Sequence, residues 1–117
     1  MAEQTLTVLN QDELVSKQAQ LYCDKLNQLA FDKGQERDFI IMQGTKFLKV
    51  TRNETEAFAF IDKKTGEVYK PKSWRKAAKG VRYNLLKKES IDKLFSNLDL
   101  YGEHLYQYAV NFINKKQ

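Results

Sequence analysis

Residues 10–33 carry apolar side chains at the spacing of an amphipathic helix. The apolar stripe consists of Leu14, Tyr22, Leu26 and Leu29. Asn10 stands just before the pattern, where its side chain can accept a hydrogen bond from a free backbone N–H group of the first turn. Gly34 follows the pattern and is a common residue at helix C-termini, because it adopts positive φ without steric cost. The pattern therefore predicts a helix over residues 10–33.

After residue 37 the hydrophobic period changes to that of β-strands. Apolar runs or alternations occupy residues 38–43, 46–50, 56–62 and 67–70. The sequence "DKKTG" before the last of these has the composition of a tight turn, and "RNETE" (52–56) provides a second hairpin connection. We predict an antiparallel meander of three or four strands within residues 38–86. The basic segment after Pro71 is expected to be a loop or a short helical turn, with "VRYNLL" as a last short strand or extended segment.

The C-terminal quarter returns to helical spacing. Ser90 is the expected N-cap of a helix whose apolar stripe consists of Ile91, Leu94, Phe95 and Leu98. After a break at residues 99–102, a second helix is predicted from about 103 to 115. The chain is thus predicted to be a single domain (1–117) of the α+β class. It combines an N-terminal helix (10–33), an antiparallel sheet with a basic loop (38–86) and a pair of C-terminal helices (90–115).

Composition narrows the setting of this domain. The 117 residues are 42% apolar and 30% charged, which suits a folded domain with a real core. Cys23 is the single cysteine, so no disulfide forms within one chain. The first residues lack the pattern of a signal peptide, and no apolar run is long enough to span a bilayer. We expect a soluble intracellular protein with no membrane association.

Positive charge is concentrated in one part of the chain. Residues 63–88, here called the basic band, hold ten cations and one acid, Glu67, for a net charge of +9. The whole chain carries +5, so the remainder carries −4. Such asymmetry predicts an anionic partner for the band.

Aromatic residues are interleaved with these cations, as in proteins that hold the phosphates of a nucleic acid and stack on its bases. The predicted phosphate-binding residues are Lys70, Lys72, Arg75, Lys76, Lys79 and Arg82. Trp74 and Tyr83 are candidates for stacking. An alternative for Trp74 is a hydrophobic anchor that holds the loop to the sheet, and the two roles are compatible.

Signals for catalysis are weak. His104 is the only histidine, and its place early in the last helix favours a surface or packing role. The phosphate-loop spacing is absent around "GTK" (44–46), and "DKKTG" lacks the ligand pattern of a calcium loop. The strand "EAFAFID" has two aromatic residues, Phe58 and Phe60, as RNA-recognition motifs do, but the rest of that motif is missing. We expect both to be core residues on one face of the strand, and we predict no catalytic residue, no metal site and no cofactor.

The stretch "FIDKKTGEVYKPKSWRKAAKGVRYNL" resembles a segment of small, uncharacterised proteins of tailed bacteriophages, many from marine viruses of cyanobacteria. The matching residues are Asp62, Thr65, Gly66, Val68, Tyr69, Lys70, Ser73, Trp74, Ala78, Lys79, Gly80, Arg82, Tyr83, Asn84 and Leu85. The resemblance covers about residues 46–86. Lys72 and Ala77 depart from it, in place of a small residue and a proline. The resemblance implies a viral protein in the host cytoplasm and no particular reaction.

Two functions follow from these observations. The first is a small phage accessory protein that binds nucleic acid, DNA or RNA, without catalysis. The second is a virion or host-takeover module that docks on an acidic host protein. In the second case the basic band supplies electrostatic steering, and Tyr101, Tyr106 and Tyr108 supply specific contacts.

Overall fold

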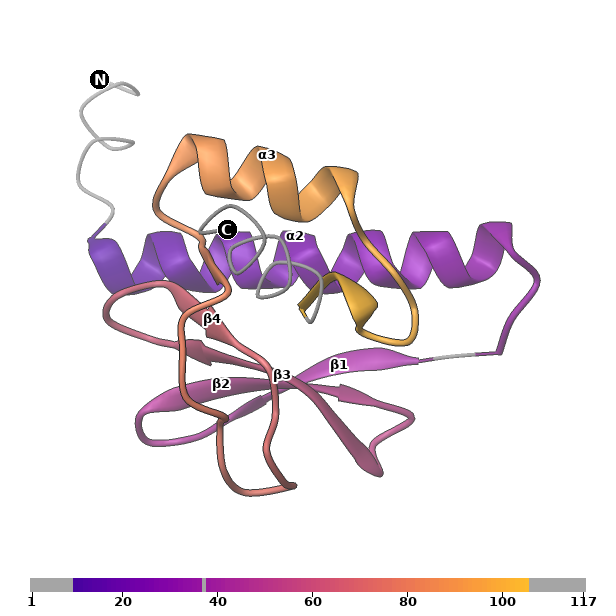
Figure 1. Cartoon of the computed structure of the whole chain (residues 1–117), viewed down its shortest axis with the longest axis horizontal. Helices are drawn as coiled ribbons and strands as arrows, with labels where there is room; N and C mark the ends of the chain where they lie inside the picture. Colours follow the sequence, from indigo (N-terminus) through magenta and orange to yellow (C-terminus); the bar gives the residue numbers. More distant parts are fainter. Residues whose placement is uncertain (1–9, 37, 106–117) are drawn as a thin grey trace, which may run out of the picture.

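The computed structural model describes residues 10–36 and 38–105 of the chain. One long helix precedes a five-stranded sheet, and a shorter helix follows it (Figure 1). The elements are α2 (Gln11–Asp32), β1 (Phe39–Gln43), β2 (Phe47–Arg52), β3 (Glu56–Asp62), β4 (Glu67–Tyr69), β5 (Tyr83–Asn84) and α3 (Lys88–Ser96). The strands pair in chain order, each antiparallel to the next. The predicted α+β class is confirmed, with one strand more than the predicted maximum.

Helix α2 begins where the sequence predicts. The Asn10 side chain accepts a hydrogen bond from the Glu13 backbone N–H at 2.8 Å, and the Glu13 carboxylate accepts one from the Asn10 N–H at 3.1 Å. This capping box satisfies two N–H groups that otherwise have no partner in the helix. The buried stripe starts at Val15, whereas Leu14, a member of the predicted apolar stripe, is 41% exposed. Gly34 ends the helix with φ +69°.

Both helices cover the same face of the sheet, which we call the inner face (Figure 1). One hydrophobic core joins this face to the helices, with Leu26 of α2, Val50 of β2, Ile61 of β3 and Leu94 of α3 among its fully buried members. Among the described elements, none of the helices lies on the opposite face, which we call the outer face. An antiparallel sheet commonly has one packed and one solvated face, and the strands here alternate accordingly.

Strand β3 departs from simple alternation. Thr51 of β2 is opposite Ala57, but Val50 is opposite Ala59, so Phe58 is an extra residue in β3. This β-bulge turns Phe58 towards the inner face, where its ring lies 4.9 Å from that of Phe39. Phe60 pairs with Lys49 on the outer face. The two phenylalanines are both buried, at 3% exposure, but the expectation that they share a face is wrong.

The C-terminal part also differs in detail from the prediction. Helix α3 begins at Lys88, two residues before the expected cap. The Ser90 hydroxyl instead accepts a hydrogen bond from the Asn84 N–H at 2.7 Å, which ties the helix to β5. A helical turn at residues 103–105 opens the predicted second helix, and residues 106–115 lie outside the described part.

His104 lies at the centre of the core, with no exposed surface. Its Nδ1 accepts a hydrogen bond from the Asp99 N–H at 3.1 Å, so its Nε2 carries the proton and donates to the Tyr22 hydroxyl at 2.7 Å. Burial lowers the pKa of His104 to about 4, although the Asp99 carboxylate opposes the shift. His104 is therefore a neutral packing residue that joins residues 99–104 to α2.

Candidate nucleic-acid interface

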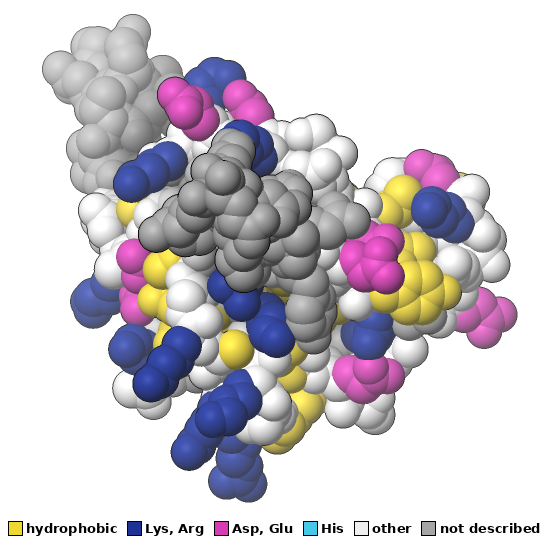
Figure 2. Space-filling view, in the orientation of Figure 1, with side chains coloured by type: hydrophobic (Ala, Val, Ile, Leu, Met, Phe, Trp, Pro, Cys, Tyr) yellow, Lys and Arg dark blue, Asp and Glu magenta, His cyan; other side chains and the backbone are white. Residues whose placement is uncertain are grey.

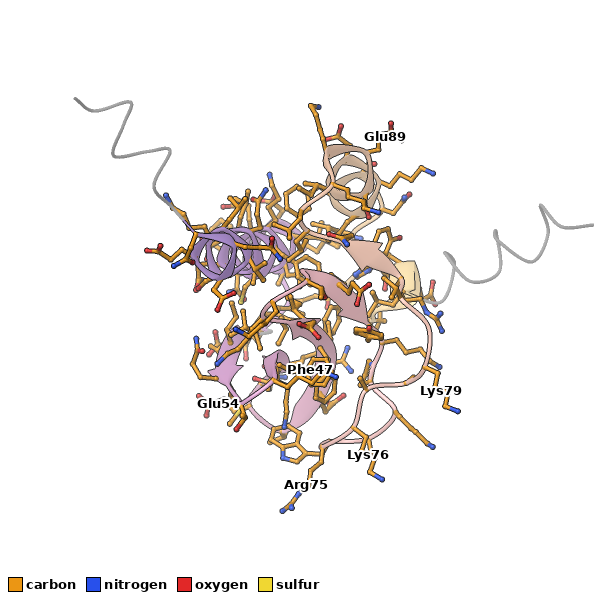
Figure 3. The ribbon with its side chains drawn as sticks, turned by 90° about the vertical axis from the view of Figure 1, so that its left-hand side faces the viewer. Phe47, Glu54, Arg75, Lys76, Lys79 and Glu89 are labelled. Atoms are coloured by element: carbon orange, nitrogen blue, oxygen red, sulfur yellow. The ribbon has the colours of Figure 1, made fainter. Side chains whose placement is uncertain are left out.

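The segment between β4 and β5 forms a hairpin arm, which we call the basic arm (residues 70–82). The Ala78 N–H donates to the Lys70 carbonyl and the Lys72 N–H to the Lys76 carbonyl, both at 2.8 Å. Between them, Pro71 and Ala77 form an isolated antiparallel bridge. These pairs extend the β4–β5 hairpin beyond the sheet, so the predicted loop has a defined path (Figure 3).

The tip of the arm turns towards the outer face of the sheet. The Ser73 hydroxyl accepts a hydrogen bond from the Lys76 N–H at 3.2 Å, which closes the turn around Trp74 and Arg75. The Lys49 ammonium group on β2 lies 3.7 Å from the centre of the Trp74 ring. Trp74 thus holds the arm to the sheet by a cation–π contact. It also stays 37% exposed, so part of its ring is open to a ligand.

The arm carries six cations and no acid. Four of the cations, Lys72, Arg75, Lys76 and Lys79, are exposed, and Arg82 is half-buried. None of these five forms an ion pair with a carboxylate in the described residues. Figure 3 shows Arg75, Lys76 and Lys79 extending from the same side of the molecule, away from Glu54 and Glu89. In Figure 2, basic side chains gather at the lower left, where Figure 1 places this arm.

The rest of the basic band is placed elsewhere. Lys64, in the β3–β4 turn, lies 3.6 Å from the Asp12 carboxylate at the start of α2. Lys88, in the first turn of α3, pairs with Asp92 at 3.0 Å. Acids of the protein therefore offset part of the charge at both ends of the band. The candidate interface is therefore limited to the basic arm and no longer includes all of residues 63–88.

Tyr83 is a correction to the predicted site. Its ring is 4% exposed in the core, and its hydroxyl donates to the His104 carbonyl at 2.9 Å. Its neighbour Arg82 has a different orientation because side chains alternate along a strand. The spacing of aromatics and cations in the sequence does not reveal this difference, and we remove Tyr83 from the interface.

The outer face holds three aromatic rings next to the arm. Phe47 makes edge contacts with Phe60 and Tyr69, at centroid distances of 5.6 and 5.9 Å. Phe60 is nearly covered, while Phe47 and Tyr69 are half-buried. The Tyr69 hydroxyl donates to Glu67 at 2.9 Å, and desolvation, followed by this carboxylate, raises its pKa to about 12. These rings form an apolar floor beneath the tip of the arm.

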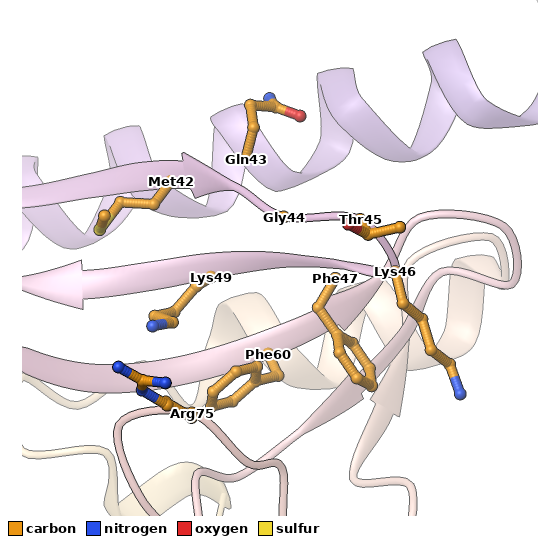
Figure 4. Close-up of a pocket in the computed structure, with 9 residues that line it drawn as sticks. All are labelled: Met42, Gln43, Gly44, Thr45, Lys46, Phe47, Lys49, Phe60 and Arg75. Atoms are coloured by element: carbon orange, nitrogen blue, oxygen red, sulfur yellow. The ribbon is translucent and has the colours of Figure 1, made fainter.

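Two further cations border this floor. Lys49 and Arg75 extend towards each other beside Phe60 (Figure 4). Desolvation, together with the charge of Arg75, lowers the pKa of Lys49. Neither is paired with a carboxylate in the part of the chain that the structure describes. The sequence analysis missed Lys49, although the alternation in "KFLKV" places it on the same side of its strand as Phe47.

An open pocket of about 250 Å³ lies at this border. Its walls come from β1, the β1–β2 turn, β2, β3 and the tip of the arm (Figure 4). Met42 lies on the β1 side and is 42% exposed. Lys46 stands at the far end beside Phe47, with its ammonium group 5.3 Å from the ring centre. The pocket thus combines aromatic surface with cations from three parts of the chain.

The inner face offers no comparable reactive group among the described residues. The Cys23 thiol is buried and donates to the Phe39 carbonyl at 2.9 Å. Burial, followed by the charges of Asp24 and Asp38, raises the pKa of Cys23 to about 12. His104 is enclosed as described above. Among residues 10–36 and 38–105, no three His, Cys, Asp or Glu side chains gather at one point, and none of the helices there has the length and apolar character needed to cross a membrane.

For the alternative docking function, only part of the predicted tyrosine set can be placed. Tyr101 is 58% exposed, next to the Asp99 carboxylate that accepts its backbone N–H. Tyr106 and Tyr108 lie outside the described residues.

The fold and the arm together define a small α+β domain with a cationic hairpin beside an open sheet face. The chain belongs to the family of unknown function DUF7717, which it matches over residues 2–107. No curated protein and no solved structure matches the chain.

Proposed function

We propose that this protein binds nucleic acid without catalysis, through the basic arm and the adjoining outer face. The supporting observation is a group of exposed cations in the arm: Lys72, Arg75, Lys76 and Lys79 form no ion pair with a carboxylate among the described residues. Arg75, Lys76 and Lys79 extend from one side of the molecule (Figure 3). Phosphates held by such side chains release condensed counterions, so binding is strong at low salt and falls steeply as salt rises. Lys70, Arg82 and Trp74 complete the proposed interface.

The shape of the arm also favours this function. A hairpin that extends beyond its sheet allows its exposed cations to reach several phosphates of one polyanion. The contact of Trp74 with Lys49 limits movement of the tip, which reduces the conformational entropy lost on binding. The setting that we propose is that of a small tailed-phage accessory protein in the host cytoplasm, in keeping with the resemblance of residues 46–86.

A charge-removal variant tests the proposal. Lys72/Lys76/Lys79→Gln takes three charges from the arm, and Lys87/Lys88/Lys93→Gln takes three from the α3 region as a matched control. We expect the arm variant to bind a labelled 12-nucleotide strand about 10- to 100-fold more weakly at about 50 mM salt. The slope of log affinity against log salt should fall by about 2 units, because each lost phosphate contact removes about 0.7–0.9.

The control variant should keep the wild-type affinity and slope. Equal losses in both variants would show that only net charge matters, and absence of any binding at low salt would refute the proposal. Pull-down from a nuclease-treated bacterial lysate addresses the alternative. Retention of an acidic protein that still binds the arm variant would favour docking on a host protein, with Tyr101 as the first residue to substitute.

A further inference from the structure

The pocket on the outer face has the size of a single chemical group. Its volume of about 250 Å³ is below the range of about 300–1,000 Å³ that is typical of sites for whole cofactors or drug-sized ligands. Aromatic walls from Phe47 and Phe60 suit a flat, apolar ring. Thr45, which also lines the pocket, carries a hydroxyl that suits a ring with a hydrogen-bonding edge.

The charges around the pocket indicate which chemical group should accompany the bound ring. Lys49 and Arg75 lie on the same side and extend towards each other without a carboxylate between them among the described residues (Figure 4). The two like charges repel each other, and a negatively charged group between them would remove that repulsion. Since the pocket also has an aromatic floor, the group that fits is an aromatic ring that carries a phosphate beside it.

Duplex DNA or RNA cannot supply such a ring, because its bases are stacked inside the helix. A single strand exposes bases that stack on aromatic side chains while its backbone follows a cationic surface. The pocket opens beside the tip of the arm, where Arg75 belongs to both. A strand that contacts Arg75 at the tip of the arm can therefore place a base in the pocket.

We propose that the outer face is a single-strand site, in which one unpaired base occupies the pocket against Phe47 while Lys49 and Arg75 hold the adjacent phosphate. This inference rests on the proposed function, because the same arm holds the rest of the strand. It adds a preference for unpaired over paired nucleic acid and for strands with bases over bare phosphate backbones.

The test compares ligands of equal charge. A 12-nucleotide oligothymidylate and a 12-unit abasic strand carry the same phosphates, and only the first has bases. We expect the oligothymidylate to bind about tenfold more tightly or better, the usual effect of one base stacked on an aromatic side chain. Trp74 is the only tryptophan in the chain, and its ring contacts Lys49, which lines the pocket. Its fluorescence should therefore change with oligothymidylate and much less with the abasic strand.

Met42→Glu sharpens the test because Met42 is opposite Lys49 in the strand pairing. The new carboxylate should pair with Lys49 across the strands and close the pocket. Leu21→Glu makes the same change in charge at a residue of similar exposure, 41% against 42%, on α2. We expect Met42→Glu to abolish the preference for oligothymidylate over the abasic strand, and Leu21→Glu to retain it.

The outcomes separate the two proposals. If both strands bind equally, Trp74 does not respond and the wild-type protein prefers a 12-base-pair duplex, the base pocket is refuted while nucleic-acid binding by the arm stands. If neither the strands nor the duplex binds at about 50 mM salt, a condition in which phosphate contacts are strong, the proposed function fails and the pocket proposal fails with it. The comparison of ligands on the wild-type protein does not depend on whether a variant folds.

Discussion

The two faces of the sheet are stabilised in different ways. On the inner face, aromatic and aliphatic side chains pack against helices, and His104 makes hydrogen bonds through both ring nitrogens. On the outer face, aromatic rings are present as well, but their neighbours are cations: Lys46 next to Phe47, and Lys49 next to Phe60 and Trp74. Aromatic residues thus pack in an apolar core on the inner face and contact cations at the surface on the outer face.

The two faces also differ in how their charges are placed. A carboxylate near Lys49 and Arg75 would lower the free energy of the fold by pairing with either of them. On the outer face, Lys49 and Arg75 instead lie close together. Their electrostatic repulsion raises the free energy of the fold, and solvent screens this repulsion without removing it. Under the proposed function, a bound ligand supplies the missing negative charge and removes this repulsion.

The largest contrast between the faces should come from truncating one apolar side chain on each. Ile61→Ala removes a fully buried side chain from the inner face and should lower the free energy of unfolding by about 2–5 kcal/mol. Met42→Ala removes a 42% exposed side chain from the outer face and should change it by no more than about 0.5 kcal/mol. Urea unfolding followed by circular dichroism measures both. Similar losses would mean that the outer face is also a structural core.

Acid should weaken the inner face through His104. Its folded-state pKa of about 4 lies below the ordinary histidine value of 6.5, so only the unfolded chain takes up a proton as pH falls below 6.5. The contribution of neutral His104 to the free energy of unfolding is fully present above pH 6.5 and is lost as the pH falls towards 4. The free energy of unfolding should fall by about 2 kcal/mol between pH 7 and 5.

His104→Gln serves as the control for this titration. The variant will be less stable than the wild type at pH 7, but it lacks the imidazole, so its stability should change much less between pH 7 and 5. A wild-type protein as stable at pH 5 as at pH 7 would contradict the buried, neutral state of His104.

A matched pair of hydroxyl deletions compares polar groups on the two faces. Tyr22→Phe removes the acceptor of the buried His104 Nε2–H group and should cost about 1–3 kcal/mol, the penalty for an unsatisfied buried donor. Tyr69→Phe removes a hydroxyl whose partner Glu67 is half-buried and near solvent. Its cost should be about 1 kcal/mol or less, because water can replace it. If thermal or urea unfolding gave equal losses of stability for Tyr22→Phe and Tyr69→Phe, the two hydroxyl groups would not differ in burial as described.

Local signals in the sequence were enough to predict the α+β class and the places of the long helix and the first four strands. Asn10 and Glu13 define the start of α2 by side-chain chemistry within one turn, and Gly66, with φ +75°, closes the "DKKTG" turn. The strands follow the alternation of apolar residues. The alternation fails in β3, because the extra residue at Phe58 is fixed by pairing with β2 and leaves no mark in the composition of the strand.

The candidate site was predicted only in part, for the same physical reason. Cations that are neighbours in sequence, such as Lys76 and Lys79, were identified because the arm is a local hairpin. Tyr83 was misassigned because its burial depends on His104, 21 residues later. Lys49 was missed because its contact with Trp74 joins residues 25 positions apart. Contacts between distant segments decide which face a side chain occupies, and a pattern of nearby residues does not contain them.

The smallest predicted effect concerns the charge of Lys49 itself. Lys49→Met keeps an unbranched apolar side chain against Phe60 and Trp74 but removes the charge. The lost cation–π contact costs about 0.5–1 kcal/mol, and the end of repulsion from Arg75 offsets part of it, so the free energy of unfolding should change by about 0.5 kcal/mol or less. Lys25→Met is the control, because Lys25 lies 5.3 Å from the Phe95 ring centre in a cation–π contact on the helical side.

In the control, the free energy of unfolding should fall by about 0.5–1 kcal/mol. Among the described cation–π contacts of the Phe95 ring, Lys25 is the one cation, so its removal relieves no repulsion like that between Lys49 and Arg75. Chemical denaturation in low and high salt measures both variants. Salt should narrow the difference between them, since it screens the repulsion that Lys49→Met removes. A loss above about 1.5 kcal/mol in Lys49→Met would show that this charge holds the arm in place. Stability alone would then explain why Lys49 lies close to Arg75, and the outer face would need no anionic ligand.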